Sequence, residues 1–183
     1  MAKVQKYRSN GMAYLLDDFS NEDGVSLFGT EWILFSDTVM GGESQAYTRR
    51  LSSDAGHCLE LGGHVSLAHQ GGFIQLALPL VHSRYLFDAR HFQGIHLMAR
   101  ADQPEGWFVH LRTRELSMPW QHYRAVFFPT PDWAVHQIPF ELFYPVSTSH
   151  PLNLERLTRI GIVAGQREFK AAIQIQELGF YPG

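Results

Sequence analysis

The pattern that most constrains this chain is a period of two in its apolar residues. In residues 94–101, Ile95, Leu97 and Ala99 alternate with His, Met and Arg side chains, and residues 107–114 alternate in the same way. Such alternation places one set of side chains on each side of a β-strand, whereas an amphipathic helix would repeat its apolar residues about every 3.6 positions. The chain is therefore expected to fold from β-strands.

Turn residues divide the chain into a series of such segments. Gly-Gly pairs, an Asp-Gly pair and two proline-containing loops separate the apolar runs. Strands are expected at 31–37, 43–51, 58–66, 72–80, 94–101, 107–114, 121–128, 133–140, 159–164 and 169–178. Strands with this regular spacing predict an all-β fold, a two-sheet β-sandwich of the jelly-roll type. One or two short helical turns are expected, at 88–92 and 153–157, with Asp88 and Asn153 as N-caps.

The composition agrees with a single β-rich domain. The 183 residues are 45% hydrophobic and 13% aromatic but only 18% charged, and aromatic side chains are favoured in strands. A single jelly-roll domain is expected over residues 12–183, after a loose N-terminal arm at residues 1–11.

The charge balance and the single cysteine limit the classes of function. A net charge of −3 gives no general attraction to nucleic acid. No apolar run reaches the roughly 18 residues of a membrane-spanning helix, so direct membrane insertion is not expected. Cys58 has no disulfide partner and is expected to be a small buried residue. Without a secretory signal, a cytoplasmic location is expected, or the mitochondrial matrix only if a presequence has been removed.

The polar residues form no recognisable catalytic or metal-binding motif. The ten histidines include neither a His-x-His pair nor a His-Glu-x-x-His motif, so no metal ion or other cofactor is expected. Residues 42–46 loosely resemble the Gly-x-Ser-x-Gly nucleophile elbow, but a strand rather than a helix is expected after Ser44. An enzyme stays a minor alternative, in which Asp37 and His110 would have to converge in one pocket.

The outward positions of several expected strands carry arginine, histidine or glutamine. Twelve of the fifteen basic residues are arginine, whose planar guanidinium makes directed contacts with carboxylates and aromatic rings. With Met98, Phe108 and Phe128 among them, these donors would form one binding face, although an ordinary solvated sheet face explains the same pattern. The outward polar residues are His96, Arg100, His110, Arg112, His122, Arg124, His136, Gln174 and Gln176.

A distinctive turn follows the first of the expected strands. The strand ends at Asp37, and the double glycine Gly41-Gly42 allows a tight reversal with positive φ. Asp37 and Ser44 are expected to close this turn through backbone N–H groups, with Met40 exposed at its tip. The structural role explains these residue types, and Met40 would in addition offer a contact to a partner.

The sequence of this turn resembles the signature of the complex I intermediate-associated protein 30 family. The string Asp-Thr-Val-Met-Gly-Gly-Glu-Ser at residues 37–44, preceded by Trp32, is the most specific part. Further stretches match in order, so the resemblance covers about residues 14–181. These stretches are 15–19, 71–73, 92–95, 111–113, Trp133 with 138–140, and 160–162. The loop at 101–106 departs from the family pattern, because it is longer and contains a proline.

The resemblance implies a galactose-binding-like jelly roll, related in architecture to carbohydrate-binding modules. For eukaryotic members it also implies a mitochondrial role in the assembly of NADH:ubiquinone oxidoreductase. The leading hypothesis is a non-catalytic binding or assembly module that holds a protein client, with subunits of that oxidoreductase as candidates. A carbohydrate-binding module that takes a glycan is the alternative, because fold and family do not fix function.

The turn and the polar sheet face are the expected contact surfaces, and Trp120 is the best exposed aromatic residue for stacking on a glycan. The expected binding residues are Asp37, Met40, Gly41, Gly42, Ser44, His96, Arg100, His110, Arg112, Trp120 and Arg124. None of them is expected to be catalytic or to hold a metal ion.

Overall fold

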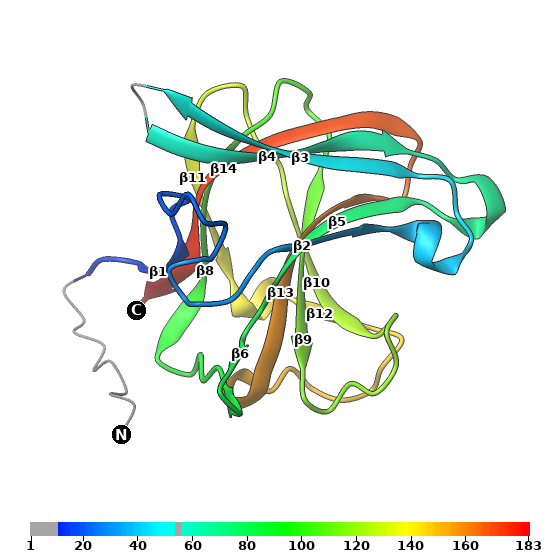
Figure 1. Ribbon diagram of the computed structural model, residues 1–183. Helices are drawn as coiled ribbons and strands as arrows, with labels where there is room; N and C mark the ends of the chain where they lie inside the picture. The colour runs from blue at the N-terminus through cyan, green and yellow to red at the C-terminus, as the bar shows by residue number, and fades with distance from the viewer. Residues whose placement is uncertain (1–10, 54–55) are drawn as a thin grey trace.

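The computed structural model describes residues 11–53 and 56–183, which form a β-sandwich of two six-stranded antiparallel sheets (Figure 1). Sheet one has, in spatial order, β11 (Ala134–Pro139), β8 (Phe92–Arg100), β14 (Phe169–Pro182), β4 (Gly56–Val65) and β3 (Gln45–Ser53), and β1 (Tyr14–Asp17) also pairs with β14. Sheet two has β12 (Tyr144–Val146), β10 (His122–Phe127), β9 (Trp107–Thr113), β13 (Leu157–Gly165), β5 (Phe73–Pro79) and β2 (Ile33–Ser36).

Short elements connect the strands of the sandwich. The hairpin of β6 (Val81–His82) and β7 (Tyr85–Leu86) forms a separate two-stranded sheet. The helical segments are single 3-10 turns: η1 (Asp37–Met40), η2 (Ala68–Gln70), η3 (Phe140–Leu142) and η4 (Leu154–Arg156). No helix in the described part of the chain has the length and apolar character needed to cross a membrane.

The structure confirms the expected all-β sandwich, and each of the ten expected strands is present. Sequence alternation missed β1, β6, β7 and β12, which are two to four residues long and too short to show a period. Asn153 caps η4 as expected, since its side chain accepts the backbone N–H of Glu155 at 3.1 Å. Residues 88–91 form a turn rather than a helix, because Phe92 already begins β8. The expected arm at 1–11 lies outside the described residues apart from Gly11.

The core fills the space between the two sheets with the alternate residues of each strand. Trp107, Val109 and Leu111 of β9 are buried, and they face Ile95 and Leu97 of β8 in the same hydrophobic cluster. Cys58 is also buried, as expected for a free cysteine. Strands such as β8, β9 and β10 bury alternate residues, so their remaining side chains lie on the two outer faces, one on each side of the sandwich, whereas β5 and β13 bury residues on both sides.

Candidate functional site

Asp37 lies at the centre of a buried hydrogen-bond network that joins the two sheets. It begins η1, directly after β2, and its side chain is fully buried. One carboxylate oxygen accepts the backbone N–H of Ser44 at 2.9 Å, and the other accepts the Ser44 hydroxyl at 2.5 Å. The second oxygen also accepts the backbone N–H groups of Gly72 and Phe73. Since Ser44 precedes β3 of sheet one and Phe73 begins β5 of sheet two, this carboxylate ties the sheets together.

The space around this carboxylate requires the glycines of the turn. Gly41 ends η1 with a φ of 87°, in the left-handed region that favours glycine. A Cβ atom at Gly42 or at Gly71 would overlap the Asp37 carboxylate. Burial would raise the pKa of Asp37, but the hydrogen bonds from Ser44 and from backbone N–H groups outweigh it and hold the pKa below its ordinary value. The residue types of this turn therefore follow from one charged, buried carboxylate.

The tip of the turn is nevertheless exposed. Met40 is 59% exposed, as predicted from the sequence for the tip of this turn. Its neighbour Val39 is more exposed still. The pairing of Asp37 with His110 in a catalytic pocket is wrong, because the Asp37 carboxylate is enclosed by its own hydrogen bonds at η1 while His110 lies on β9.

The polar residues expected on one face lie in different places. Those of β8 and β14 belong to sheet one, whereas those of β9 and β10 belong to sheet two. His136 points to neither outer face: it lies opposite Leu97 in the β8–β11 register and packs 5.4 Å from the ring of Phe127, a core residue. The single Arg/His face is therefore a wrong expectation, because alternation gives the side of a strand but not the sheet to which the strand belongs.

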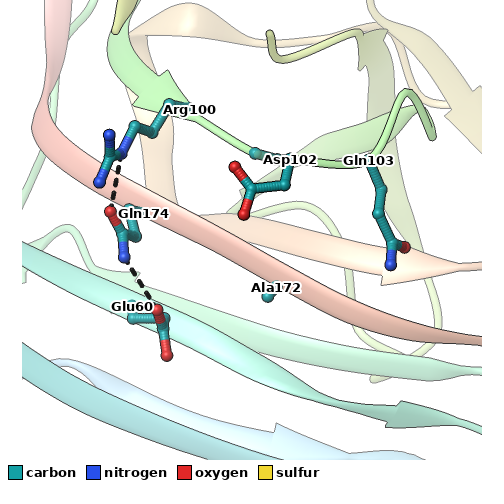
Figure 2. Close-up of a pocket in the computed structure, with 7 residues that line it drawn as sticks. Glu60, Arg100, Asp102, Gln103, Ala172 and Gln174 are labelled. Atoms are coloured by element: carbon teal, nitrogen blue, oxygen red, sulfur yellow. Dashed lines mark hydrogen bonds between the residues drawn. The ribbon is translucent and has the colours of Figure 1, made fainter. Parts of the chain in front are cut away.

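On the outer face of sheet one, polar side chains satisfy one another. Glu60 on β4 is buried, and its carboxylate accepts hydrogen bonds from Arg49 at 2.9 Å and from Gln174 at 3.0 Å. Arg100 Nε donates to Gln174 Oε1 at 2.8 Å, which Figure 2 shows as a continuous chain across β4, β14 and β8. The Arg100 guanidinium lies 5.0 Å from the centre of the Trp133 ring. We call Arg49, Glu60, Gln174 and Arg100 the Glu60 chain.

Two further features complete this face. His96 Nε2 lies 2.7 Å from a carboxylate oxygen of Glu177, so its polar edge is also engaged. A small cavity lies beside the Glu60 chain, with Asp102 and Gln103 reaching over Ala172 from the loop after β8 (Figure 2). Part of the cavity lining therefore comes from the loop after β8.

The outer face of sheet two presents guanidinium groups without acidic partners. Arg112 on β9, Arg124 on β10 and Arg159 on β13 form no ion pair with any residue in the described ranges. Arg124 lies over the Phe108 ring at 4.8 Å, and Arg159 lies over the Phe35 ring at 5.4 Å. We call this surface the arginine face; its residues are Phe35, Phe108, His110, Arg112, His122, Arg124 and Arg159.

Two histidines stack on each other in the arginine face. The rings of His110 and His122 are parallel within 16°, with centroids 3.8 Å apart. Burial holds the pKa of His110 well below its ordinary value and lowers the pKa of His122 to about 4, and the adjacent Arg124 contributes in the same direction. His122 Nδ1 lies 2.9 Å from the carbonyl of Trp120 and donates to it, so His122 Nε2 is a buried acceptor that has no partner in the described residues. Both imidazoles are therefore neutral near pH 7.

Arg112 has a structural task that the sequence did not indicate. Its guanidinium donates to the backbone carbonyls of Met118, Pro119 and Gln121, and to that of Leu116. These carbonyls belong to the loop between β9 and β10, on which Trp120 is 55% exposed. Arg112 thus positions the loop that carries Trp120, so its predicted direct contact with a partner is not needed to explain its presence.

Sequence reasoning missed Arg159 and Phe35 as parts of the same surface. The strand 159–164 was expected, and its alternation places Arg159 on the side opposite to the buried Ile160 and Ile162. That alternation was the available signal, but only the strand order puts β13 beside β9. Within the described residues, no cluster of three or more His, Cys, Asp or Glu side chains is suited to hold a metal ion.

The model of one protein family matches most of the chain. Residues 18–175 match the Complex I intermediate-associated protein 30 (CIA30) family, and the chain belongs to this family. The matched range includes the turn around Asp37, whose hydrogen-bond network joins the two sheets. No curated protein matches the sequence significantly.

Several solved structures with the same fold are carbohydrate-binding modules of Clostridium thermocellum. The family 11 module of the cellulosomal cellulase Lic26A-Cel5E superposes with a TM-score of 0.73 at 16% identity, covering 96% of this chain and 97% of the module. A family 11 module in complex with a β-1,3-1,4-mixed-linked tetrasaccharide gives a TM-score of 0.68 at 14% identity, with 92% and 95% coverage. A family 30 module gives 0.59 at 11% identity, with 82% and 91% coverage. At these identities the likeness shows the fold alone.

Proposed function

We propose that this CIA30-family domain is a non-catalytic binding module that holds a protein client on its arginine face. The observation that carries the proposal is the contrast between the outer faces. Arg100 on sheet one is engaged by Gln174, whereas Arg159 on sheet two is half-buried without an acidic partner. Burying a cation without a partner costs free energy, which a client would recover by supplying the partner.

The family membership supports a particular client. Subunits of NADH:ubiquinone oxidoreductase, which is complex I, fit the name of the family, Complex I intermediate-associated protein 30. The exposed Val39 and Met40 at the tip of the turn would offer a second, apolar contact. A location in the cytoplasm, or in the mitochondrial matrix after removal of a presequence, would place the module in the same compartment as such a client.

Affinity capture tests this function. The immobilised protein is incubated with a detergent extract of the host, and subunits of the oxidoreductase are quantified by mass spectrometry. Phe128, which is 62% exposed beside the arginine face, is changed to Asp, and exposed Leu142 on η3 is changed to Asp as the matched control. We expect Phe128→Asp to lower recovery at least ten-fold and Leu142→Asp to leave it unchanged. Equal recovery by all three proteins, or no recovery by the wild type, would reject the proposal.

A glycan is the second candidate ligand, favoured by Trp120. Its ring is exposed, the Arg112 hydrogen bonds hold its loop in place, and a module of similar fold is known in complex with a mixed-linked tetrasaccharide. Affinity electrophoresis in gels containing mixed-linked β-glucan tests this alternative. Retardation that Trp120→Ala abolishes would support it, and equal mobility with and without the polysaccharide would remove it.

A further inference from the structure

The strand register of sheet two places two arginines opposite one another on the arginine face. Arg159 on β13 lies opposite Arg112 on β9, and Arg124 on β10 lies opposite His110 on β9. Like charges in directly opposite positions destabilise a sheet. The arginines that act on His110 are Arg124 and Arg159, and the charged group that acts on Arg159 is Arg112. The surface is therefore positive without local compensation.

Arg159 has the most unused hydrogen-bonding capacity of these groups. Its guanidinium lies over the Phe35 ring and forms no hydrogen bond with any other residue that the structure describes. Burial and the neighbouring Arg112 both lower the pKa of Arg159, because both disfavour its charged form. A guanidinium stacked on a ring keeps its N–H donors in the plane of the group, so they point sideways, where a planar acceptor can reach them.

Arg124 offers a second set of donors on the neighbouring part of the face. Its Nε donates to His110 Nε2 at 3.3 Å, and within the described residues its two terminal nitrogens have no acceptor. Arg112 differs, because its terminal nitrogens already donate to loop carbonyls. These carbonyls are neutral, so Arg112 still contributes its full charge to the surface.

The aromatic residues of this face do not form a platform for a sugar ring. Stacking of a pyranose needs an open ring face, but guanidinium groups already cover the faces of Phe35 and Phe108. What the surface offers instead is a group of in-plane N–H donors, which match carboxylate oxygens in geometry and in charge.

Apolar side chains border these donors. Val126 and Phe128 continue the outward side of β10 beyond Arg124 and are exposed, and Tyr144 on β12 lies opposite Arg124 and is also exposed. A ligand that covers both the guanidinium donors and the apolar side chains beside them must combine carboxylates with apolar groups. Acidic and apolar amino-acid side chains provide that combination, whereas the hydroxyl groups of an anionic glycan do not.

We propose that the arginine face binds an acidic peptide segment of the client, with carboxylates on Arg159 and Arg124 and apolar side chains on Val126, Phe128 and Tyr144. The inference rests on the proposed client-binding function and deepens it by naming the chemistry of the segment. Charge complementarity is the argument for this occupant, because a carboxylate would supply the partner that Arg159 lacks.

Titration with defined probes tests the proposal on the whole chain. The probes are acetyl-Glu-Leu-Glu-Leu-Glu-Leu-amide, the matched peptide in which Gln replaces each Glu, and trigalacturonic acid as an anionic glycan with the same number of carboxylates. Binding is followed by NMR through the side-chain Nε–Hε signals of arginine in the wild-type protein. The variant is Arg159→Gln, and Arg84→Gln, an exposed arginine between β6 and β7, removes the same charge elsewhere.

We expect the acidic peptide to shift the signals of Arg159 and Arg124, and the Gln peptide to bind at least ten-fold more weakly. Arg159→Gln should weaken binding of the acidic peptide at least ten-fold, and Arg84→Gln less than two-fold. Equal affinity for both peptides, equal effects of the two variants, or tighter binding of trigalacturonic acid would overturn the proposal. Because the Nε–Hε shifts need no variant, the test holds even if Arg159→Gln changes the fold.

The capture experiment separates this proposal from the proposed function. If Arg159→Gln captures oxidoreductase subunits as well as the wild type does, the acidic segment is wrong and client binding stands. If the acidic peptide binds through Arg159 but no subunit is captured, the chemistry of the face stands and the proposed client is wrong.

Discussion

The two outer faces of the sandwich use arginine in opposite ways. On sheet one, Arg49 forms an ion pair with the buried Glu60, and Arg100 is linked to the same carboxylate through Gln174. On sheet two, Arg159 lies opposite another arginine, and no acidic residue in the described chain pairs with either. The difference lies in the cross-strand neighbour rather than in the residue type. We therefore expect Arg100 to stabilise sheet one and Arg159 to contribute no stability to sheet two.

The comparison separates residues that maintain the fold from residues kept for a partner. Proteins store unfavourable interactions mainly at functional sites, where the rest of the structure supports them. The Glu60 chain and the Asp37 network are satisfied within the chain, whereas the arginine face is not. Substitutions in the two kinds of region should therefore change the free energy of unfolding by amounts that differ in sign as well as in size.

The largest effect is expected at Asp37, on which both sheets depend. Asp37→Ala would leave the backbone N–H groups of Ser44, Gly72 and Phe73 without this acceptor and would remove the shorter of the two hydrogen bonds that the Ser44 hydroxyl donates, which should lower the free energy of unfolding by about 4 kcal/mol. Urea denaturation followed by tryptophan fluorescence measures the change. Asp18→Ala, at an exposed turn, is the control and should cost less than about 1 kcal/mol. A loss at Asp37 no larger than that of the control would contradict the network's role.

A smaller loss is expected on sheet one alone. Glu60→Ala removes the acceptor of Arg49 and Gln174 and should lower the free energy of unfolding by about 2 kcal/mol. The matched control is Glu155→Ala, since this carboxylate is exposed and its loss should cost about 0.5 kcal/mol or less. The same urea titrations measure both variants. If the two variants are equally stable, the Glu60 chain does not stabilise sheet one.

The histidine pair on sheet two should make the stability of the fold depend on pH. Burial depresses the pKa of His122 to about 4, so between this value and the ordinary histidine value the unfolded chain binds a proton that the folded chain does not. Stability should therefore fall as the pH decreases from about 6.5 toward 4. In this window, His122→Gln should reduce the proton uptake on unfolding by about one proton, measured from the pH dependence of the free energy of unfolding. An unchanged uptake would show that His122 is not held neutral in the fold.

Much of the fold could be predicted from the sequence because each long strand carries its own signal. Alternation identified β8, β9 and β14, and the residues of the turn indicated that Asp37 and Ser44 would close it. The position of Phe73, whose backbone N–H completes the network, could not be predicted, because it depends on a contact across 36 residues.

The candidate site was predicted only in its parts. His110, Arg112 and Arg124 were identified as outward residues, but the strand order that joins them to Arg159 and separates them from Arg100 depends on long-range pairing. Alternation carries no information about which strands become neighbours. The loop contacts of Arg112 could not be foreseen for a related reason, since the carbonyls it binds are backbone groups that no sequence pattern marks.

The free energy of unfolding of Arg159→Met tests most directly whether the arginine face is kept for a partner. Methionine keeps the apolar stem over Phe35 and removes the charge opposite Arg112. We expect the variant to equal the wild type or to exceed it by about 0.5 kcal/mol in urea denaturation, because a repulsive pair is relieved. A loss of more than about 1 kcal/mol would mean that Arg159 stabilises the fold, and it would contradict the contrast between the two faces.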